Sequence, residues 1–249
     1  MLRSKYIPVM MFMFVVVLLI GTAGCTATVS DGGCKMLEDE LERANAELAE
    51  LRSELDKVDA EIATASLEEL LQQRRSIREY GDAPLTRDEV MKLLWAGQGI
   101  TSDRGFRTAP SAGALYPLEL YVVAGNVDNL APGVYKYNPA KDELTLVKQG
   151  DVRASLAAAS LGQGSVADGA IDIVMAAVYE RTKVKYGARG ERYVHIEVGH
   201  AAQSICLQAT ALGLGLVTIG AFDDAEVAKI VGMSQDESPL YVLPVGRIK

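Results

Sequence analysis

The chain has 249 residues, of which 49% are hydrophobic and 23% charged, and its formal net charge is −8. This composition is typical of a globular protein with a sizeable core, and the length fits one folded domain with appendages. A negatively charged chain lacks the basic face that follows nucleic-acid phosphates, so we predict no nucleic-acid partner. Three cysteines cannot build a disulfide framework, and their spacing matches no zinc pattern.

Residues 1–24 have the pattern of a secretory signal peptide. Two basic residues precede an apolar run over residues 7–20, and small residues follow it. The run is shorter than the roughly 20 residues that span a membrane. Cys25 then stands where the lipobox of exported lipoproteins has its cysteine, although Thr22 replaces a usually larger apolar residue. We therefore predict lipidation of Cys25 and anchoring at the outer face of the cell membrane, with an uncleaved anchor or an ordinary cleavage site as the alternatives.

Residues 25–65 are predicted to form a linker and a coiled-coil stalk. From Leu37 to Ile62, apolar residues alternate spacings of four and three, which is the seam of a coiled coil held for about four heptads. The flanking charges do not fix the orientation of the helices, and a lone amphipathic helix packed on its own domain is the alternative. Cys34 precedes the seam; outside the cytoplasm it would bridge two parallel chains or stay a free thiol.

The folded domain is predicted to occupy residues 66–249 as an α+β sandwich with one layered core. Capping boxes at Ser66 and Thr86 each begin a helix. The first helix is predicted to end in RRSIREY, and the second to carry Leu93, Leu94 and Trp95 on its apolar side. The later elements are predicted, in chain order, as strands at 118–124, 133–139 and 143–149, a helix at 151–160, a buried strand at 170–179, a long helix at 191–212, a strand at 215–221, a helix at 224–232 and a strand at 240–246.

Residues 74–78, RRSIR, place three arginines and a serine within five residues. Guanidinium groups pair with phosphate oxygens and the hydroxyl adds a donor, so the segment predicts a compact anion receptor. A solvated basic helix end that complements the helix dipole is the alternative.

Two further stretches combine small residues with a strand. RTAPSAGALYPLELYVV, at 107–123, and LGLGLVTIGAF, at 212–222, both leave backbone with little side-chain cover. The glycines of the second stretch close a helix and open a strand, which is the reverse of a dinucleotide-binding fingerprint, so we reject that motif.

The two histidines give no metal pattern. His195 and His200 match neither His-Glu-x-x-His nor His-x-x-Glu-His, and we interpret them as structural. Cys206 lies inside an apolar helix, where a buried thiol is ordinary. No Ser-His-Asp or catalytic cysteine arrangement is indicated.

Taken in order, RRSIR, EVMKLLWAGQGIT, RTAPSAGALYPLELYVV, PGVYKYNP, HIEVGHAAQSICLQATALGLG and LYVLPVGR resemble the nitroreductase family, and within it the SagB-type dehydrogenase branch. The resemblance covers roughly residues 68–249. It implies a central antiparallel-type sheet flanked by helices, an FMN cofactor, and an intertwined homodimer with the flavin at the subunit interface.

The resemblance also implies roles for individual residues. Those expected to hold the FMN phosphate and the pyrimidine side of the ring are Arg74, Arg75, Ser76 and Arg78. Those expected to come from the partner subunit are Pro110, Ser111, Ala112, Gly113 and Leu115. Those expected beside the reactive nitrogen of the flavin are Thr218, Ile219 and Gly220. Family members commonly add a basic phosphate contact near the C-terminus, for which Arg247 is the candidate and Lys249 a weaker one.

Lys185 and Tyr186 match the Lys-Tyr pair of SagB-type oxidases that dehydrogenate peptide azolines. A lysine near the ring could take or give a proton while hydride moves to the flavin. An exposed loop with an ordinary lysine and tyrosine is the alternative.

We therefore predict a membrane-tethered FMN-dependent oxidoreductase that transfers hydride between a small organic or peptide substrate and flavin. It is expected to be a homodimer through both the FMN domain and the stalk. Reduced nicotinamides are cytoplasmic, so an exported enzyme would rarely meet them. We therefore expect the hydride to come from the enzyme's own substrate, or the electrons from a membrane quinone or electron carrier. The alternative is a lipid-anchored, non-catalytic binding or scaffold module that has lost its flavin chemistry.

Overall fold

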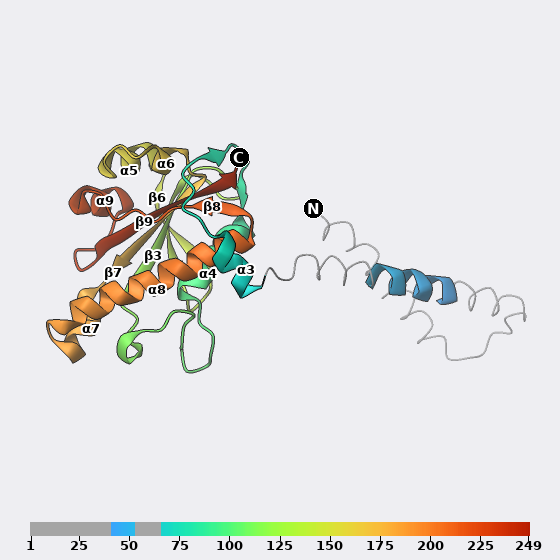
Figure 1. Cartoon of the computed structure of the whole chain (residues 1–249), viewed down its shortest axis with the longest axis horizontal. Coiled ribbons are helices and arrows are strands. Elements are labelled where there is room, and N and C mark those ends of the chain that lie inside the picture. The colour runs from blue at the N-terminus through green and yellow to red at the C-terminus, as the bar shows by residue number, and fades with distance from the viewer. Residues whose placement is uncertain (1–40, 53–65) are drawn as a thin grey trace, which may run out of the picture. The chain divides into compact units, whose positions relative to one another are not determined.

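The computed structural model describes residues 41–52 and 66–249 (Figure 1). Contacts divide the chain into two compact units, Met1–Ala63 and Thr64–Lys249. The predicted signal peptide, Cys25, Cys34 and most of the predicted stalk lie outside the described residues.

The described part of the first unit is a helix over residues 41–52. Leu41 and Leu51, two positions of the predicted seam, are both exposed in it. The helix agrees with the helical character of the predicted stalk, whereas its pairing with a second chain stays a prediction.

The second unit is built on an antiparallel sheet, as predicted. Within residues 66–249 its strands run in the order β1-β9-β7-β3-β5-β6, and β8 pairs with β9. The strands are β1 (Tyr80–Gly81), β3 (Leu118–Ala124), β5 (Gly133–Asn138), β6 (Glu143–Gln149), β7 (Ile171–Ala177), β8 (Leu214–Leu216) and β9 (Ser238–Ile248), and a separate parallel pair joins β2 (Leu85–Thr86) and β4 (Val127–Asp128).

Helices cover both faces of this sheet (Figure 1). They are α3 (Leu67–Gln73), α4 (Arg87–Gln98), the 3-10 turn η1 (Ala112–Ala114), α5 (Arg153–Ala159), α6 (Gly164–Asp168), α7 (Tyr179–Tyr186), α8 (Arg189–Ala211) and α9 (Asp224–Val231).

The alternation of side chains along the central strands produces two cores. Leu118, Leu120 and Val122 of β3 point to one face and pack with buried residues of α4 and α8. Tyr121 and Val123 point to the other face and pack with residues of α5 and α9. β7 is buried along its whole length because both faces are covered, which is why its sequence is almost continuously apolar.

Both predicted capping boxes are present. The Ser66 hydroxyl accepts from the Glu69 N–H at 3.2 Å, and the Thr86 hydroxyl accepts from the Glu89 N–H at 3.2 Å. Each glutamate in turn accepts from the backbone N–H of its capping residue at 2.7 Å. These caps fix where α3 and α4 begin.

The predicted end of the first helix is wrong. α3 ends at Gln73, and Arg74 already has the non-helical angles φ −54° and ψ 122°. The Ile77 N–H donates to the Leu216 carbonyl at 2.9 Å, so pairing beside β8 draws the RRSIR segment into an extended conformation.

The prediction that Trp95 lies on the apolar side of α4 is also wrong. Trp95 is 45% exposed, whereas Leu93 and Leu94 are fully buried. The buried face of α4 is completed by Val90 and Gly97, and Trp95 lies off that stripe.

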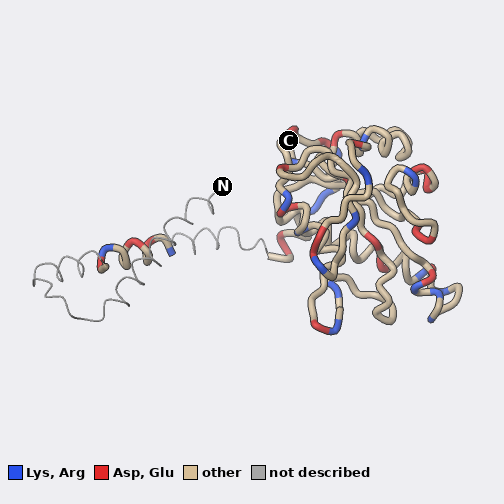
Figure 2. The backbone as a smooth tube through the Cα atoms, turned by 180° about the vertical axis from the view of Figure 1, so that it is seen from behind, with Lys and Arg blue, Asp and Glu red and all other residues tan. Residues whose placement is uncertain are grey.

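The described residues offer neither a membrane span nor a metal cluster. No helix among them is long and apolar enough to cross a bilayer. They also hold no group of three or more His, Cys, Asp or Glu side chains that could ligate a metal ion. Basic and acidic residues are interspersed along the described backbone (Figure 2).

Candidate functional site

The segment 74–76 forms one wall of a cavity of about 180 Å³. Here the chain runs extended, held by the hydrogen bond from Ile77 to Leu216. Because side chains two residues apart in an extended chain share a side, Arg74 and Ser76 both face this cavity. A helix through the same residues would have turned them apart.

The helix α8 and the segment after β8 complete the cavity. Gly199 and Ala202 of α8 contribute almost no side-chain bulk, and Thr218 brings an exposed hydroxyl. The remaining lining residues are Gln203, Cys206, Leu216, Val217 and Tyr241.

The backbone of residues 218–220, which follow β8, lies beside this cavity. Ile219 pairs with Val242 through two hydrogen bonds of 2.9 Å. Because peptide groups alternate in direction along an extended chain, those of Thr218 and Gly220 point away from β9. A Cβ on Gly220 would lie 3.5 Å from the Tyr241 ring, an ordinary contact, so packing within the chain does not require glycine there.

The other two arginines of the RRSIR segment lie outside this cavity. Arg75 lines a neighbouring cavity of about 170 Å³ and donates to the Gln72 and Arg74 carbonyls at 2.8 and 2.7 Å. Arg78 is exposed. Arg74 borders both cavities, so it is the arginine of the segment that is shared between them.

The loop 110–116 is tightly bent. Gly113, Ala114 and Tyr116 have φ values of 66°, 54° and 46°, in the left-handed region that only glycine adopts without strain. The Ser111 hydroxyl closes the loop by accepting from the Tyr116 N–H at 2.9 Å. Of the predicted contact residues in this loop, the half-buried ones are Ser111, Ala112 and Leu115, and the exposed ones are Pro110 and Gly113.

Lys185 and Tyr186 lie against the exposed side of this loop. A Cβ placed on Gly113 would be 2.9 Å from Lys185 Nζ and 2.9 Å from the Tyr186 hydroxyl. The two polar groups therefore converge on the bare backbone of Gly113. They belong to the last turn of α7 and not to an exposed loop, which was the alternative, and the Tyr186 ring meets Tyr193 edge to face at 5.0 Å.

A buried carboxyl group lies on the inner side of the same loop. Glu197 of α8 is 2% exposed. Its burial raises its pKa to about 7, although hydrogen bonding from Ser111 and Ala112 and the charge of Arg107 act in the opposite direction. Glu197 was not predicted as a site residue, although its spacing of three and four residues from the apolar Val194 and Ala201 marks an inward-facing position.

Two groups of predicted residues are thus each brought together, but they do not line the same cavity. Arg74, Ser76 and Thr218 line one cavity, and that cavity includes no residue of the loop 110–116. Gly113 instead meets Lys185 and its neighbour on α7.

Arg247 is not brought to the cavity. Its Nη1 and Nη2 donate to the two carboxylate oxygens of Glu89 at 2.7 and 2.8 Å, and Nη2 also donates to the Pro84 carbonyl at 3.1 Å. Its guanidinium is committed to the start of α4. Lys249, the weaker candidate, is exposed and lies 4.0 Å from Glu79.

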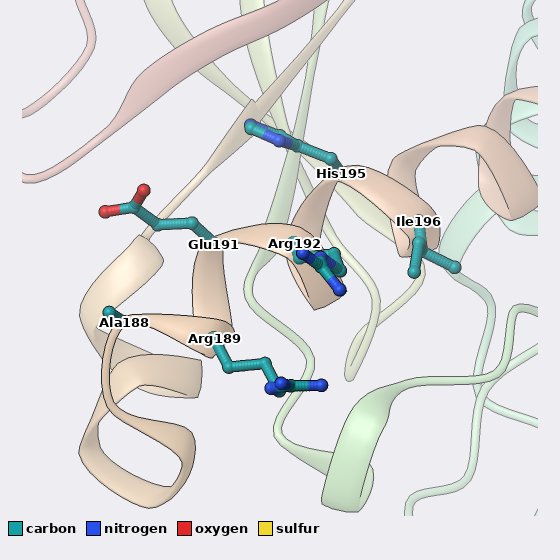
Figure 3. Close-up of a pocket in the computed structure, with 6 residues that line it drawn as sticks. All are labelled: Ala188, Arg189, Glu191, Arg192, His195 and Ile196. Carbon is teal, nitrogen blue, oxygen red and sulfur yellow. The ribbon is translucent and has the colours of Figure 1, made fainter.

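A wider hollow of about 680 Å³ lies over the first turns of α8. Figure 3 shows that its labelled side chains all come from this helix end and spread apart rather than toward one point. His195, one of them, pairs with the Tyr179 hydroxyl at 2.6 Å, in keeping with a structural role. This hollow lacks the convergent polar groups of a binding site.

The fold and the ordered motifs define a class of protein. The model of the nitroreductase family matches residues 71–247, most of the chain. The chain belongs to the nitroreductase family, as its motifs indicated, and is an oxidoreductase of that family.

Its relatives place it on the SagB-type dehydrogenase branch. A nitroreductase-family protein of Methanocaldococcus jannaschii is 48% identical over 187 residues, which cover 75% of this chain and 93% of that protein. The microcin B17-processing protein McbC of Escherichia coli is 30% identical over 142 residues, 55% of this chain and 52% of McbC. A chain of the solved E. coli microcin synthetase complex McbBCD, with truncated pro-MccB17 bound, matches with a TM-score of 0.61 and 26% identity over 75% of each chain.

Proposed function

We propose that this chain is an FMN-dependent oxidoreductase that transfers hydride between a small organic or peptide substrate and the flavin. The observation that carries the proposal is the cavity at the RRSIR segment. Three residues expected at the flavin from two separate motifs, Arg74, Ser76 and Thr218, line it together.

The chemistry of the cavity fits FMN. A guanidinium and two hydroxyls are donors suited to phosphate and to ring carbonyl oxygens. The small side chains of Gly199 and Ala202 leave space beside α8 for a flat ring. FMN, when bound, supplies the hydride chemistry, and the protein supplies position and charge.

The loop 110–116 supplies the other wall of the proposed site. Gly113 carries no side chain, and the Lys185 amine and the Tyr186 hydroxyl lie against its backbone, so the loop presents these two groups to a bound ring. Lys185 Nζ, beside it, takes or gives the proton that accompanies hydride transfer, and the Tyr186 hydroxyl orients the group that exchanges this proton. Within residues 66–249, no carboxylate lies within salt-bridge distance of Lys185, so its amine is available for that exchange.

The two walls are proposed to meet across a homodimer. The Arg74 cavity and the Gly113 surface are separate on one chain, so a second copy can close each cavity with its own loop. Lys185 and Tyr186 would then arrive from the same subunit as the loop, because they contact it within the chain.

Lipid anchoring at Cys25 and an outer-face location are part of the proposal. They rest on the sequence pattern of residues 1–25. The Cys25→Ser variant should lose labelled fatty acid and membrane association, whereas Cys34→Ser should keep both. Reduced nicotinamides are scarce at that location, so the electrons are proposed to come from the substrate itself and to leave to a quinone or a protein electron carrier.

The decisive experiment is titration of the purified full chain with FMN, followed by anaerobic reduction with candidate donors. We expect a yellow protein, and a flavin affinity at least about tenfold weaker in Arg74→Ala than in the exposed-loop control Arg104→Ala. A colourless protein that takes up no added FMN would instead support a non-catalytic, lipid-anchored binding module. Oxidation of NADH at rates typical of nitroreductases would contradict the proposed electron source alone.

A further inference from the structure

Tyr116 ends the loop 110–116 in a conformation that its own sequence does not favour. Its φ of 46° is in the left-handed region, where residues other than glycine are rare. Such strain persists only where surrounding contacts over-determine the conformation. The contacts of Tyr116 therefore help to decide the shape of the loop.

The polar groups of Tyr116 are all engaged. Its N–H donates to the Ser111 hydroxyl at 2.9 Å, and its own hydroxyl accepts from the Arg107 N–H at 3.2 Å. The Arg107 guanidinium lies 4.6 Å from the centre of its ring. Its carbonyl accepts from Arg181 Nη1 at 3.1 Å. Of these contacts, the one from Arg181 connects the loop to a helix, α7.

Arg181 joins two acceptors through one guanidinium group. Nη1 donates to the Tyr116 carbonyl, and Nη2 lies 2.5 Å from Oε1 of Glu119, a residue of β3. The other oxygen of Glu119, Oε2, lies 3.3 Å from Lys136 Nζ of β5, so the sheet holds this carboxylate in place. A planar guanidinium presents its donors in a fixed fork, which the single amine of a lysine does not reproduce.

Arg181 also shares a face of α7 with Lys185. The two are four residues apart, so their side chains project from the same side of the helix on successive turns. Arg181 contacts the end of the loop at Tyr116. Lys185 Nζ lies 2.9 Å from where a Cβ on Gly113 would be. The first contact therefore sets how closely α7 approaches the loop at the second.

Little apolar packing fixes the position of α7. Only Thr182 of its eight residues is buried. The ion pairs of Lys183 stay within α7 or reach α8, and the Tyr179 hydroxyl pairs with His195 of α8 at 2.6 Å. Segments with few buried apolar contacts open at a low free-energy cost. A polar contact such as that of Arg181 is then enough to determine where α7 lies against the loop.

We propose that Arg181 is a positioning residue, which clamps α7 onto the loop 110–116. The clamp keeps Lys185 and Tyr186 against the Gly113 backbone. Arg181 acts through the helix and the loop, and not on the substrate or the flavin. Its consequence for catalysis rests on the proposed function, whereas the clamp itself does not.

Hydrogen exchange on the purified full chain, with and without FMN, tests the clamp. The readout is the amides of Tyr116 and Gly187, which are hydrogen-bonded within the loop and at the end of α7. Arg181→Gln should raise both exchange rates about tenfold while the amides of β7 stay protected. Arg181→Lys should raise the rate at Tyr116 nearly as much, because an amine paired with Glu119 does not also hold the Tyr116 carbonyl in the geometry of the fork.

Lys183→Gln is the matched control. Lys183 lies on the same helix, but its ion pairs do not involve the loop. This variant should leave the exchange rate at Tyr116 unchanged. The proposal is overturned by unaltered exchange in Arg181→Gln, by equal loosening of the loop in Lys183→Gln, or by full protection in Arg181→Lys.

Anaerobic flavin reduction measures the consequence for catalysis. With a donor that reduces the wild-type flavin, Arg181→Gln should slow reduction about tenfold at saturating donor while the affinity for FMN stays within about twofold. A merely structural role would lower the rate and the affinity together. A wild-type rate in a variant with a loosened loop would refute the link to catalysis. If the wild-type chain binds no FMN, the proposed function fails, and exchange without FMN still decides whether the clamp exists.

Discussion

Gly113 combines a positive φ with side chains packed closely against its backbone. Its φ of 66° is in the left-handed region, and a Cβ there would meet Lys185 Nζ and the Tyr186 hydroxyl at 2.9 Å. Gly105 has a similar φ of 77°, but a Cβ there would meet nothing within 4 Å. Substitutions at these two glycines carry similar backbone strain, but only a side chain at Gly113 would collide with neighbouring groups. Comparing them separates the two effects.

We predict that Gly113→Leu loses flavin before it loses its fold. A side chain there displaces Lys185 and Tyr186, the two groups that the proposed ring would contact, whereas Gly105→Leu carries a comparable backbone strain of about 1 kcal/mol without that displacement. Flavin content from visible absorbance and the midpoint of thermal unfolding measure the two effects. A yellow Gly113→Leu protein would mean that the loop only turns the chain.

At the scale of single residues, the sequence predicts which side chains carry donor groups better than it predicts which acceptor each donor binds. Arg74, Ser76 and Thr218 carry donor groups and were predicted together, and they do share a cavity. Arg247 was predicted from its place in the chain, but its forked guanidinium pairs with Glu89. A guanidinium fits phosphate and carboxylate equally well, so only the three-dimensional neighbours decide between them.

At the scale of elements, Glu237 connects three parts of the sheet. It lies just before β9 and accepts from the Tyr121 hydroxyl of β3 at 2.7 Å and from Lys136 Nζ of β5 at 2.5 Å. The Ser234 N–H donates to it at 2.9 Å. Burial alone would raise its pKa, but these hydrogen bonds outweigh burial and lower the pKa to about 2.

We predict that Glu237 stabilises the domain in a pH-dependent manner. Because its pKa is depressed in the folded state, its contribution is complete above the unfolded value of 4.5 and is lost as the pH falls through about 2. Glu237→Gln should lower the free energy of unfolding by roughly 2 kcal/mol at neutral pH, and by less toward pH 2. Denaturant unfolding across this range measures it. The surface pair of Glu226 with Lys229 is the control, and Glu226→Gln should cost less than about 0.5 kcal/mol.

Elements with clear periodicity and capping signals were predictable, and those without them were not. The β5–β6 hairpin, the buried β7 and the capped starts of α3 and α4 follow from alternation and from Ser66 and Thr86. α7 was missed because only Thr182 of its eight residues is buried, so its sequence carries no apolar stripe. The end of α3 was misplaced because a partner distant in sequence, Leu216, competes for the backbone.

At the scale of the whole molecule, the proposed site requires two chains. A mixed dimer of Arg74→Ala and Lys185→Ala subunits tests this arrangement. If the two residues serve one site from different subunits, random mixing restores about a quarter of the wild-type activity, because half the dimers each contain one intact site. If both residues serve a site within one chain, mixing restores none. Co-expression with distinct affinity tags isolates the mixed dimer, whose turnover per dimer should be about half that of the wild type in the first case and absent in the second.

The position of β9 in the sheet affects the order in which the domain can fold. β9 lies between β1 and β7 and also pairs with β8, so the strand made last joins parts of the sheet that were made long before. Until residues 238–248 leave the ribosome, β7 has an open edge and β1 and β8 have no strand to join. Such non-local pairing is expected to slow folding, because β1, β7 and β8 are joined through a strand distant from them in sequence. We therefore expect the sheet to close only once β9 is available, with the edge of β7 unpaired until then.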